Sequence, residues 1–412
     1  MLSAQSLPLI TATLPLVGER MPVIARNFYG RMFAAHPELF DGLFSRSNQK
    51  NGSQQQALAG SIAAFATHLV NNPETTPEAM LSRIAHKHVS LDIRPEQYEV
   101  VYQYLFEAIA EELSDVITPE IVDAWTEVYW LMAHALIKLE SSLHSAAASD
   151  HPLAPWVVVA KEAAGTDAVT FTLEPADDTP VTPSLPGQYV SVTVRMPDGI
   201  HQVRQYSLSA NAGSDTRVFT TRLDADGEVS PALHRDVQIG DQLILSNPCG
   251  DITLSTGDSP LVLASAGIGC TPIASILRSL ADQGSRREVL VLHTENTLER
   301  WALRDQMLED VALLEAAELE LWLEVPSDGD GAHDGFMSLA NVAIPENASV
   351  YLCGPLPFMR SLRSQAIESG VPAERIHYEV FGPDLWLAGS YSESTSGLPV
   401  LTARLTKNVL SI

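Results

Sequence analysis

Three side chains in the first part of the chain combine polar chemistry with an apolar setting: His88, Tyr98 and Glu140. Helical periodicity places His88 on one face with Leu81 and Ile84, and it places the other two within the apolar stripes of later helices. A buried carboxylate and a buried phenol each need a polar partner. Such a cluster is typical of a metal-ligand histidine whose second ring nitrogen is held by its neighbours. If the metal is haem iron, His88 is the expected axial ligand. The alternative is an ordinary core histidine.

Residues on earlier helices could form the opposite wall of this pocket. Tyr29 lies on a helix predicted over 22–34, and Gln54 precedes Leu58 by one turn, so both of these face the same way. Tyr29 and Gln54 would supply hydrogen-bond donors over an apolar floor, as an oxygen-binding pocket requires. Phe44 could pack on the ring of the haem. Taken singly, these residues could equally be core, surface and loop-anchoring residues.

A strand motif in the middle of the chain suits a flavin, namely Arg204, Gln205, Tyr206 and Ser207. An arginine can bind a pyrophosphate, an aromatic ring can stack on a flavin, and a hydroxyl can bond a ring nitrogen. Alternation along the strand puts Arg204 and Tyr206 on one face and the other two on the opposite face. For Tyr206, and for Tyr189 upstream, the alternative is packing on a sheet surface.

A glycine-rich turn further along predicts a phosphate site. It follows a buried strand, opens a helix and reads Gly267, Ile268, Gly269, Cys270, Thr271, Pro272. Backbone N–H groups and the positive end of a helix dipole suit phosphate there. The turn lacks the complete dinucleotide fingerprint, so a plain tight turn is the alternative.

The elements that must position these residues change type twice along the chain. Apolar stripes of helical period cover 54–70, 77–88, 95–113 and 119–144, which predicts an all-α domain over 1–149. Six short alternating segments separated by Gly and Pro predict a small antiparallel β-barrel over 150–257. The predicted strands cover 156–160, 169–174, 189–194, 204–209, 217–223 and 242–245.

Strands and helices then alternate over 258–383, which predicts a doubly wound parallel α/β domain. The predicted strands cover 261–264, 289–293, 319–325, 349–353 and 376–381, and the predicted helices cover 272–283, 299–316 and 356–369. The fold class is therefore multi-domain, with a C-terminal tail over 384–412 that has weak signals only.

Composition narrows the classes of function. The 412 residues carry 25 Lys and Arg against 51 Asp and Glu, a net charge of −26, which disfavours nucleic acid and anionic membrane surfaces as partners. We read no signal peptide and no apolar run of about 18 residues, so we expect no stable membrane association. Three scattered cysteines fit a reducing cytoplasm.

The chain resembles the flavohaemoglobins, in which a globin is fused to a ferredoxin-reductase-like module that binds FAD and NAD(P)H. The resemblance covers about residues 1–383 and is clearest in five globin segments. These are Asn27-Phe28-Tyr29-Gly30-Arg31-Met32-Phe33, His36-Pro37-Glu38-Leu39, Ser47-Asn48-Gln49-Lys50-Asn51-Gly52, Ala85-His86-Lys87-His88 and Arg94-Pro95-Glu96-Gln97-Tyr98. The reductase part adds the sequence from His377 to Pro383.

This resemblance implies roles for individual residues. His88 would be the proximal haem ligand, oriented by Tyr98 and Glu140, with Tyr29, Gln54 and Leu58 lining the distal pocket. Lys87 would influence the haem–flavin environment. The loop Cys353, Gly354, Pro355 would lie on the nicotinamide side, with Cys353 near the carbon that transfers hydride. The closing segment Glu379, Val380, Phe381, Gly382, Pro383 would cover the flavin and tune its potential. Cys270 stands where relatives commonly carry Gln.

The resemblance also implies cofactors and an activity. Haem b and FAD would be bound, hydride would pass from NADH or NADPH to FAD, and electrons would pass on to the haem. O₂ and nitric oxide would be the substrates and nitrate the product, as in a nitric oxide dioxygenase that detoxifies NO. We expect a monomer, and an acidic residue at Glu295 favours NADH. Two alternatives stay open: an oxygen-binding or redox-sensing haemoprotein, and a flavin reductase with a regulatory globin.

Overall fold

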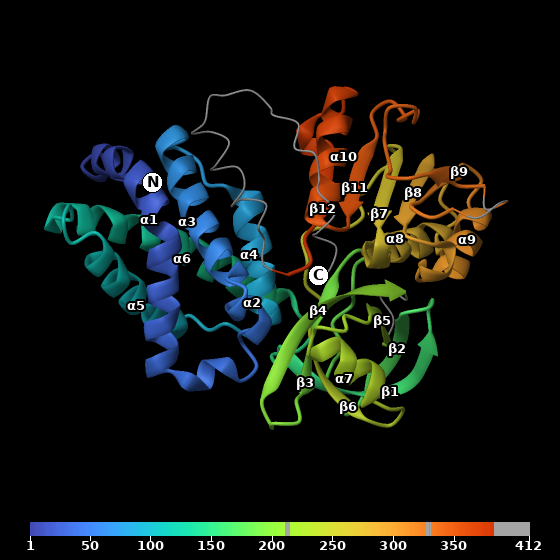
Figure 1. The fold of residues 1–412 in the computed structure, drawn as a ribbon, viewed down its shortest axis with the longest axis horizontal. Helices are drawn as coiled ribbons and strands as arrows, with labels where there is room; N and C mark the ends of the chain where they lie inside the picture. Colours follow the sequence, from blue (N-terminus) through green and yellow to red (C-terminus); the bar gives the residue numbers. More distant parts are fainter. Residues whose placement is uncertain (211–214, 327–328, 330, 383–412) are drawn as a thin grey trace.

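The computed structural model describes residues 1–210, 215–326, 329 and 331–382. A helical region, a β-barrel and an α/β region follow one another in chain order and meet around the centre of the molecule (Figure 1). This agrees with the three predicted fold types. Pro383 and the tail 384–412 lie outside the described residues, and the predicted domain boundaries stay predictions.

The helical region is built from long helices around one apolar core. Its elements are α1 (Ser6–Ala35), η1 (Pro37–Phe40), α2 (Arg46–Lys50), α3 (Ser53–Asn71), α4 (Glu78–Ser90), α5 (Glu96–Glu112) and α6 (Pro119–Ala146). Helix α1 packs against α3, α5 and α6, and α4 packs against α6. Helix α6 begins where the sequence signals it, because the Thr118 side chain accepts a hydrogen bond from the Ile121 N–H beside Pro119. The core that forms leaves a pocket lined by α1, α3, α4, α5 and α6.

Helix α1 corrects two expectations. It starts at Ser6 rather than near Pro22, and it contains both Pro15 and Pro22. It is also long and apolar enough to cross a membrane by length and composition, contrary to our reading that no such segment exists. Its apolar side chains recur at helical spacing and are buried in the core, among them Ile10 and Ile24 at 0% exposure. This packing makes α1 a core helix and offsets the cost of its internal prolines.

The middle region is a closed barrel with the strand order β1-β2-β5-β4-β3-β6. The strands are β1 (Leu153–Ala163), β2 (Ala168–Pro175), β3 (Tyr189–Arg195), β4 (His201–Ala210), β5 (Arg217–Arg222) and β6 (Gln242–Ser246). All neighbouring strands pair antiparallel. Closure removes free sheet edges, and the interior is filled by residues such as Phe171, Phe219 and Val192. Helix α7 (Val229–Arg235), which the sequence analysis did not predict, follows β5.

The third region contains a six-stranded parallel sheet with the order β10-β9-β8-β7-β11-β12. The strands are β7 (Leu261–Ala266), β8 (Val289–Glu295), β9 (Ala317–Leu323), β10 (His333–Asp334), β11 (Ser349–Cys353) and β12 (Ile376–Glu379). The helices are α8 (Cys270–Asp282), α9 (Arg304–Leu313) and α10 (Leu356–Glu368), with short turns η2 (Gly267–Gly269), η3 (Leu298–Arg300) and η4 (Ala373–Arg375). The chain order reverses beside β7, where a ligand crevice is expected in such sheets.

The helix predicted over 299–316 is shorter in the structure. Leu303 has a φ of 59°, in the left-handed region, so α9 begins only at Arg304. The residues before it instead place the Trp301 ring on His293, with ring centroids 4.7 Å apart. This stacking holds the segment just before α9 against the end of β8.

Candidate active site

One cavity of about 1250 Å³ runs between the three regions. It reaches from the interior of the helical region, past α4, to the outer face of barrel strand β4 and to the glycine turn before α8. The lining includes Tyr29, Gln54, Leu58, Lys87 and His88 from the helices, and Arg204, Gln205, Tyr206, Ser207, Ile268, Thr271 and Glu379 from the other regions. The predicted haem-side and flavin-side residues therefore share one continuous space.

The predicted contacts around His88 are present. His88 Nδ1 lies 2.8 Å from Glu140 Oε1 and 2.9 Å from the Tyr98 hydroxyl, and that hydroxyl donates to Glu140 Oε1 at 2.5 Å. Glu140 is 3% exposed, and burial together with the Glu140 charge raises the pKa of Tyr98 well above its usual value. The phenol therefore stays a donor and the carboxylate an acceptor. With Nδ1 engaged, the second ring nitrogen, Nε2, is left for a ligand.

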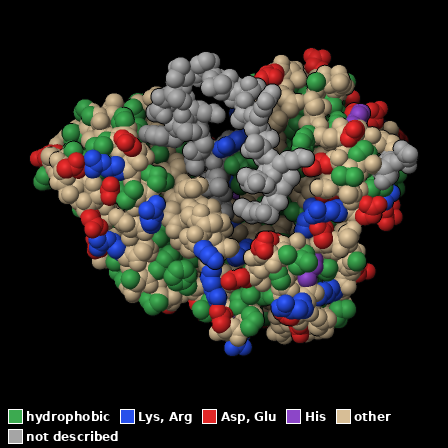
Figure 2. All heavy atoms as spheres, in the orientation of Figure 1, with side chains coloured by type: hydrophobic (Ala, Val, Ile, Leu, Met, Phe, Trp, Pro, Cys, Tyr) green, Lys and Arg blue, Asp and Glu red, His purple; other side chains and the backbone are tan. Residues whose placement is uncertain are grey.

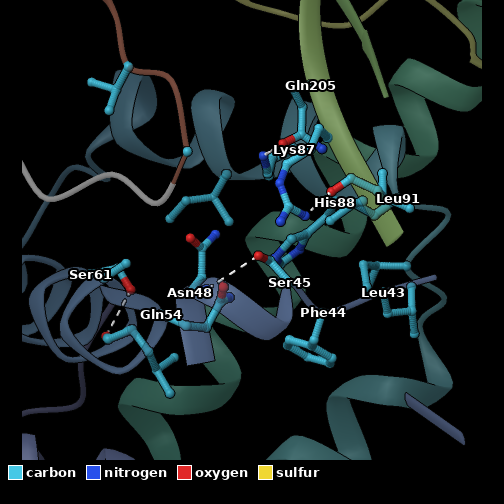
Figure 3. Close-up of a pocket in the computed structure, with 18 of the residues that line it drawn as sticks. Leu43, Phe44, Ser45, Asn48, Gln54, Ser61, Lys87, His88, Leu91 and Gln205 are labelled. Carbon is cyan, nitrogen blue, oxygen red and sulfur yellow. Dashed lines mark hydrogen bonds between the residues drawn. The ribbon is translucent and has the colours of Figure 1, made fainter. Parts of the chain in front are cut away.

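The opposite wall of the pocket comes from α1, the 36–52 segment and α3. Tyr29 hydrogen-bonds Gln54, and burial raises the pKa of Tyr29, so its hydroxyl keeps its proton at neutral pH. The Phe44 ring meets the Tyr29 ring edge-on, with centroids 5.9 Å apart. Figure 3 shows Gln54 and Phe44 on one side of the space and His88 and Leu91 on the other.

Lys87 lies where the helical region meets the barrel. Its Nζ donates to Gln205 Oε1 on β4, and the Gln205 amide donates to Ser191 Oγ on β3 at 2.8 Å. Ser191 Oγ is 2.9 Å from Ser90 Oγ at the end of α4. Burial lowers the pKa of Lys87 to about 8, although the nearby Glu379 carboxylate acts against this. A hydrogen-bonded chain therefore ties the helix of His88 to the proposed flavin strand.

All four residues of the strand motif line the cavity. The Tyr206 ring stacks on Phe219 with centroids 5.0 Å apart, and Arg204 reaches across to Ser47 Oγ of the helical region at 3.1 Å. Ser207 Oγ is buried and has no hydrogen-bond partner within the described ranges. A buried hydroxyl without a partner is costly, so a polar ligand atom fits beside it. Tyr189 is also buried at this wall, and the wall is completed by Val380, Phe381 and Gly382.

The glycine turn before α8 and the loop after β11 are each packed too tightly for a side chain at one glycine. A Cβ on Gly269 would lie 2.4 Å from the carbonyl oxygen of Cys353, and one on Gly354 would lie 2.9 Å from both Ala266 Cβ and Phe358 Cδ1. The turn before α8 and the loop after β11 therefore approach each other backbone to backbone. Ile268 and Thr271 reach the cavity from this turn.

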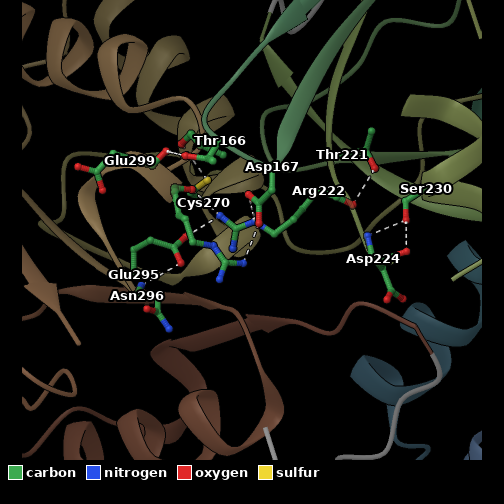
Figure 4. Close-up of polar contacts among 12 residues, drawn as sticks. Thr166, Asp167, Thr221, Arg222, Asp224, Ser230, Cys270, Glu295, Asn296 and Glu299 are labelled. Atoms are coloured by element: carbon green, nitrogen blue, oxygen red, sulfur yellow. Dashed lines mark hydrogen bonds and ion pairs between the residues drawn. The ribbon is translucent and has the colours of Figure 1, made fainter. Parts of the chain in front are cut away.

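Other predicted nicotinamide-side residues do not reach the cavity. Its lining contains none of Gly267, Gly269, Cys270, Pro272, Cys353, Gly354 and Pro355. Cys353 is 1% exposed, and burial raises the pKa of its thiol well above the usual value. Glu295 is engaged by Arg222 at 2.6 Å and by the Asn296 N–H at 3.0 Å, so each carboxylate oxygen already has one protein partner (Figure 4). The NADH preference stays a prediction.

Sequence reasoning missed several lining residues. Ser45 caps the short helix α2 and Asn48 lies within it, joined by a 3.3 Å hydrogen bond from the Asn48 N–H to Ser45 Oγ, and a helix this short shows no periodicity in the sequence (Figure 3). Arg222 ends β5 and faces the glycine turn, and its position depends on residues far away in sequence. The signal that the sequence offers for Arg222 is a charged residue at the end of a predicted strand.

The three regions match three families of domain. A globin model matches residues 26–136, an oxidoreductase FAD-binding domain model matches 155–254, and an oxidoreductase NAD-binding domain model matches 263–364. The fold and the site therefore define a globin joined to a flavin- and nicotinamide-dependent reductase module.

Relatives that match nearly the whole chain show to which family of such fusion proteins it belongs. The flavohemoprotein of Rhizobium meliloti is 37% identical over 94% of this chain and all of its own length. The crystal structure of flavohemoglobin from Malassezia yamatoensis with bound FAD and heme is 44% identical, with a TM-score of 0.88 over 92% of this chain and all of that one. The FAD/NAD-binding domain of the nitric oxide dioxygenase from Vibrio cholerae is 33% identical, with a TM-score of 0.53 over 56% of this chain and 99% of that one. The chain belongs to the flavohaemoprotein family.

Proposed function

We propose that the chain is a nitric oxide dioxygenase that converts NO and O₂ to nitrate with electrons from NAD(P)H. Each NO consumes one O₂ and one electron in this reaction. The observation that carries the proposal is the single cavity in which His88, Lys87 and the strand residues 204–207 lie in succession. A related reductase domain belongs to a nitric oxide dioxygenase, and a full-length relative is a flavohemoglobin with bound FAD and heme.

The residues around His88 fit a haem. Within the described ranges, no three His, Cys, Asp or Glu side chains could jointly hold a bare metal ion. A single histidine with one nitrogen engaged and the other facing an apolar cavity fits a metal whose remaining ligands come from a macrocycle. In this proposal, haem supplies the binding of O₂ and the transfer of electrons. Glu140 accepts a hydrogen bond from the Nδ1–H of His88, which fixes the ring and increases its donor strength.

The distal residues have a separate role in this proposal. Tyr29, kept protonated by burial, donates a hydrogen bond where negative charge develops on oxygen. Gln54 orients the Tyr29 hydroxyl, and Leu58 and Phe44 keep the floor apolar and exclude water. These residues act through position and proton donation alone.

The strand motif fits FAD. Arg204 supplies charge for a diphosphate, Tyr206 supplies a ring face, and Ser207 supplies the buried hydroxyl without a partner. Phe381, 45% exposed at the cavity mouth, would cover the flavin, and Glu379 and Val380 would form its edge. Lys87 and Gln205 hold the helix of His88 against this strand, which keeps the path for electrons short.

The coenzyme would enter from the α/β region. The turn 267–272 and the loop 353–355 approach each other closely, and this fits a nicotinamide coenzyme that lies along their backbones. We infer NADH as the preferred form, a monomeric protein and a cytoplasmic location without stable membrane attachment. Three free, buried cysteines are compatible with a reducing compartment.

The order of electron flow tests this proposal without air. NADH should bleach the flavin of the FAD- and haem-loaded protein first and reduce the haem second. Addition of O₂ and NO should then yield nitrate in proportion to the electrons stored. Flavin reduction without haem reduction would instead support a flavin reductase with a regulatory globin.

A further inference from the structure

The segment 37–50, which joins α1 to α3, forms part of the pocket wall opposite His88 but is weakly anchored in the helical region (Figure 3). Throughout this described segment, Ser45 alone is buried. Its two regular elements, η1 and α2, have only four and five residues. A segment that buries so little surface opens easily unless other contacts hold it. Its position therefore depends on what lies outside the helical region.

Two aromatic rings connect this segment to Tyr29. Phe40 packs on Phe33 with ring centroids 4.0 Å apart, and Phe44 meets the Phe33 ring edge-on at 5.1 Å. Phe33 stacks on Tyr29 at 5.6 Å, and Phe44 also contacts the Tyr29 ring directly. Because packed rings transmit displacement, a shift of the segment would move the rings around Tyr29. The segment therefore helps to set where the Tyr29 hydroxyl points.

The hairpin formed by β3 and β4 of the barrel holds the segment before Phe44. Asp41 Oδ1 accepts a hydrogen bond from the His201 N–H at 2.7 Å and lies 2.9 Å from His201 Nδ1. The N–H of Gly42 donates to the His201 carbonyl at 3.1 Å. Gly42 has a φ of 85°, a left-handed conformation that glycine adopts without strain. Three contacts thus fix residues 41 and 42 beside the first residue of β4.

The same hairpin holds the segment after Phe44. Arg46 Nη1 lies 2.7 Å from Asp198 Oδ2 in the turn between β3 and β4, and the Arg46 N–H donates to Gln202 Oε1 at 3.1 Å. An exposed ion pair contributes little by itself, but these contacts act on one short segment together with those at Asp41. Phe44 therefore lies between two attachments to the same hairpin of the barrel.

We propose that the β3–β4 hairpin of the barrel positions the oxygen-binding side of the haem pocket through Asp41 and Arg46. These two residues and their partners on the hairpin lie outside the cavity lining, so they are positioning residues that act by holding Phe44 and, through it, Tyr29. The barrel proposed to bind FAD is then also a structural part of the oxygen site. This inference rests on the proposed function, because it takes His88 as the haem ligand and Tyr29 as the donor to oxygen.

The first test changes only the barrel. D198N removes the charge that pairs with Arg46 and keeps an oxygen that can accept from the Ile200 N–H. H201A removes the ring beside Asp41 and leaves both main-chain contacts. In the double variant D198N/H201A, O₂ should dissociate from the ferrous, haem- and FAD-loaded full-length protein roughly 3- to 10-fold faster than in the wild type, as expected for the loss of two modest contacts. Replacement of O₂ by CO measures this rate.

The C–O stretching frequency of the carbon monoxide complex distinguishes positioning from a general loss of stability. A hydrogen-bond donor beside the bound CO lowers this frequency, so displacement of Tyr29 in D198N/H201A should raise it toward the value of Y29F. Added to Y29F, the two barrel substitutions should change neither the frequency nor the O₂ dissociation rate further, because coupled residues are not additive. Full additivity with Y29F, or a wild-type rate and frequency in D198N/H201A, would overturn the proposal.

D115N is the matched control. It removes the charge of another exposed ion pair, in which Arg20 Nη1 lies 2.8 Å from Asp115 Oδ1, away from the cavity lining. Its O₂ dissociation rate and C–O frequency should equal those of the wild type. In D198N/H201A, FAD content and the rate at which NADH reduces the flavin should also be unchanged. A loss of FAD or slower flavin reduction would show that the substitutions disturb the barrel itself, and would overturn the proposal.

A second comparison serves if D198N/H201A fails to fold. R46M and D198N should each speed O₂ dissociation by the same factor, and the variant with both changes should be no faster than either, because they break one ion pair. Additive effects would contradict the proposal. None of these measurements involves NO, so a protein that binds haem and O₂ without forming nitrate would fail only the dioxygenase assignment. Nitrate formation with a wild-type O₂ dissociation rate in D198N would fail only the role of the hairpin.

Discussion

Lys87, the neighbour of His88 on α4, donates a hydrogen bond from Nζ to Oε1 of Gln205 on barrel strand β4. The helix that carries the proposed haem ligand is thus joined directly to the strand that carries the proposed flavin site. Arg83 on the same helix packs over the Tyr378 ring of the α/β region, 4.4 Å from its centroid. Helix α4 therefore contacts both parts of the reductase module.

Removing His88 should abolish stable haem binding. In H88A, the imidazole whose Nδ1 is held by Glu140 is gone, and the proposed axial ligand is lost with it. The haem-to-protein ratio after purification should fall severalfold, whereas the FAD content should stay unchanged. H68A, which alters a histidine on α3 outside the cavity lining, is the control. A wild-type haem spectrum in H88A would refute the assignment.

Glu140 should control the donor strength of His88. E140Q keeps the shape but replaces a carboxylate acceptor with an amide, so the proton on His88 Nδ1 is held less strongly. The iron–histidine stretching frequency should decrease, and NO turnover should fall about 10- to 100-fold. E120Q, an exposed change at the start of the same helix, should alter neither quantity. An unchanged stretching frequency in E140Q would contradict this role.

Tyr29 should retain bound O₂. In Y29F the ring and its packing remain, and only the buried hydroxyl is lost. Loss of one hydrogen bond to a charged acceptor should speed O₂ dissociation roughly 10- to 100-fold. Flash photolysis or ligand-replacement kinetics measure this rate. If dissociation is as slow as in the wild type, the distal role of Tyr29 is wrong.

Gly269 should tolerate no side chain. A Cβ there would stand 2.4 Å from the Cys353 carbonyl oxygen, so G269A must push two backbone segments apart. We expect a loss of about 1–3 kcal/mol in unfolding free energy and weaker NAD⁺ binding, measured by denaturant titration and calorimetry. G30A is the control, because nothing lies within 4 Å of its Cβ, and it should change stability by no more than about 1 kcal/mol. Equal stabilities of the two variants would contradict the close approach.

Asp310 should make stability depend on pH. It is fully buried beside Arg278 at 2.9 Å, and burial outweighs that cation and raises the pKa of Asp310 to about 6. Between pH about 4 and 6 the folded carboxyl keeps a proton that the unfolded chain has lost. Its contribution to unfolding free energy therefore falls by about 3 kcal/mol as pH rises through this window.

D310N removes this titration. The wild-type melting temperature should fall relative to that of D310N between pH 4 and 6.5, as followed by fluorescence. Parallel curves for the two proteins across this range would show that Asp310 does not titrate there.

Local patterns predicted much of the fold. The stripes over 95–113 and 119–144 became α5 and α6, because periodicity and the Thr118–Pro119 start signal act within a few residues. The contact of His88 with Tyr98 and Glu140 also followed from the pattern, since buried polar groups must find each other.

The remaining features depend on contacts between distant segments. The extension of α1 through Pro15 and Pro22 is stabilised by packing against three other helices. Leu303 has a left-handed backbone conformation, and α9 begins at the next residue. No local sequence pattern predicts this conformation. The pairing of Arg222 with Glu295 joins residues 73 positions apart, in two different regions. Because of this pairing, Glu295 already has a protein partner where we expected it to contact only the ribose of the coenzyme.

The central claim is tested most directly by NO consumption in aerated buffer, with the haem- and FAD-loaded protein and NADH. NO should disappear rapidly and only when NADH is present, with one nitrate formed for each NO lost. H88A, and wild-type protein without NADH, should show no such turnover. Slow NO loss without matching nitrate, despite full cofactor content and an intact oxygen complex, would contradict the dioxygenase assignment and favour an oxygen-binding or sensing role.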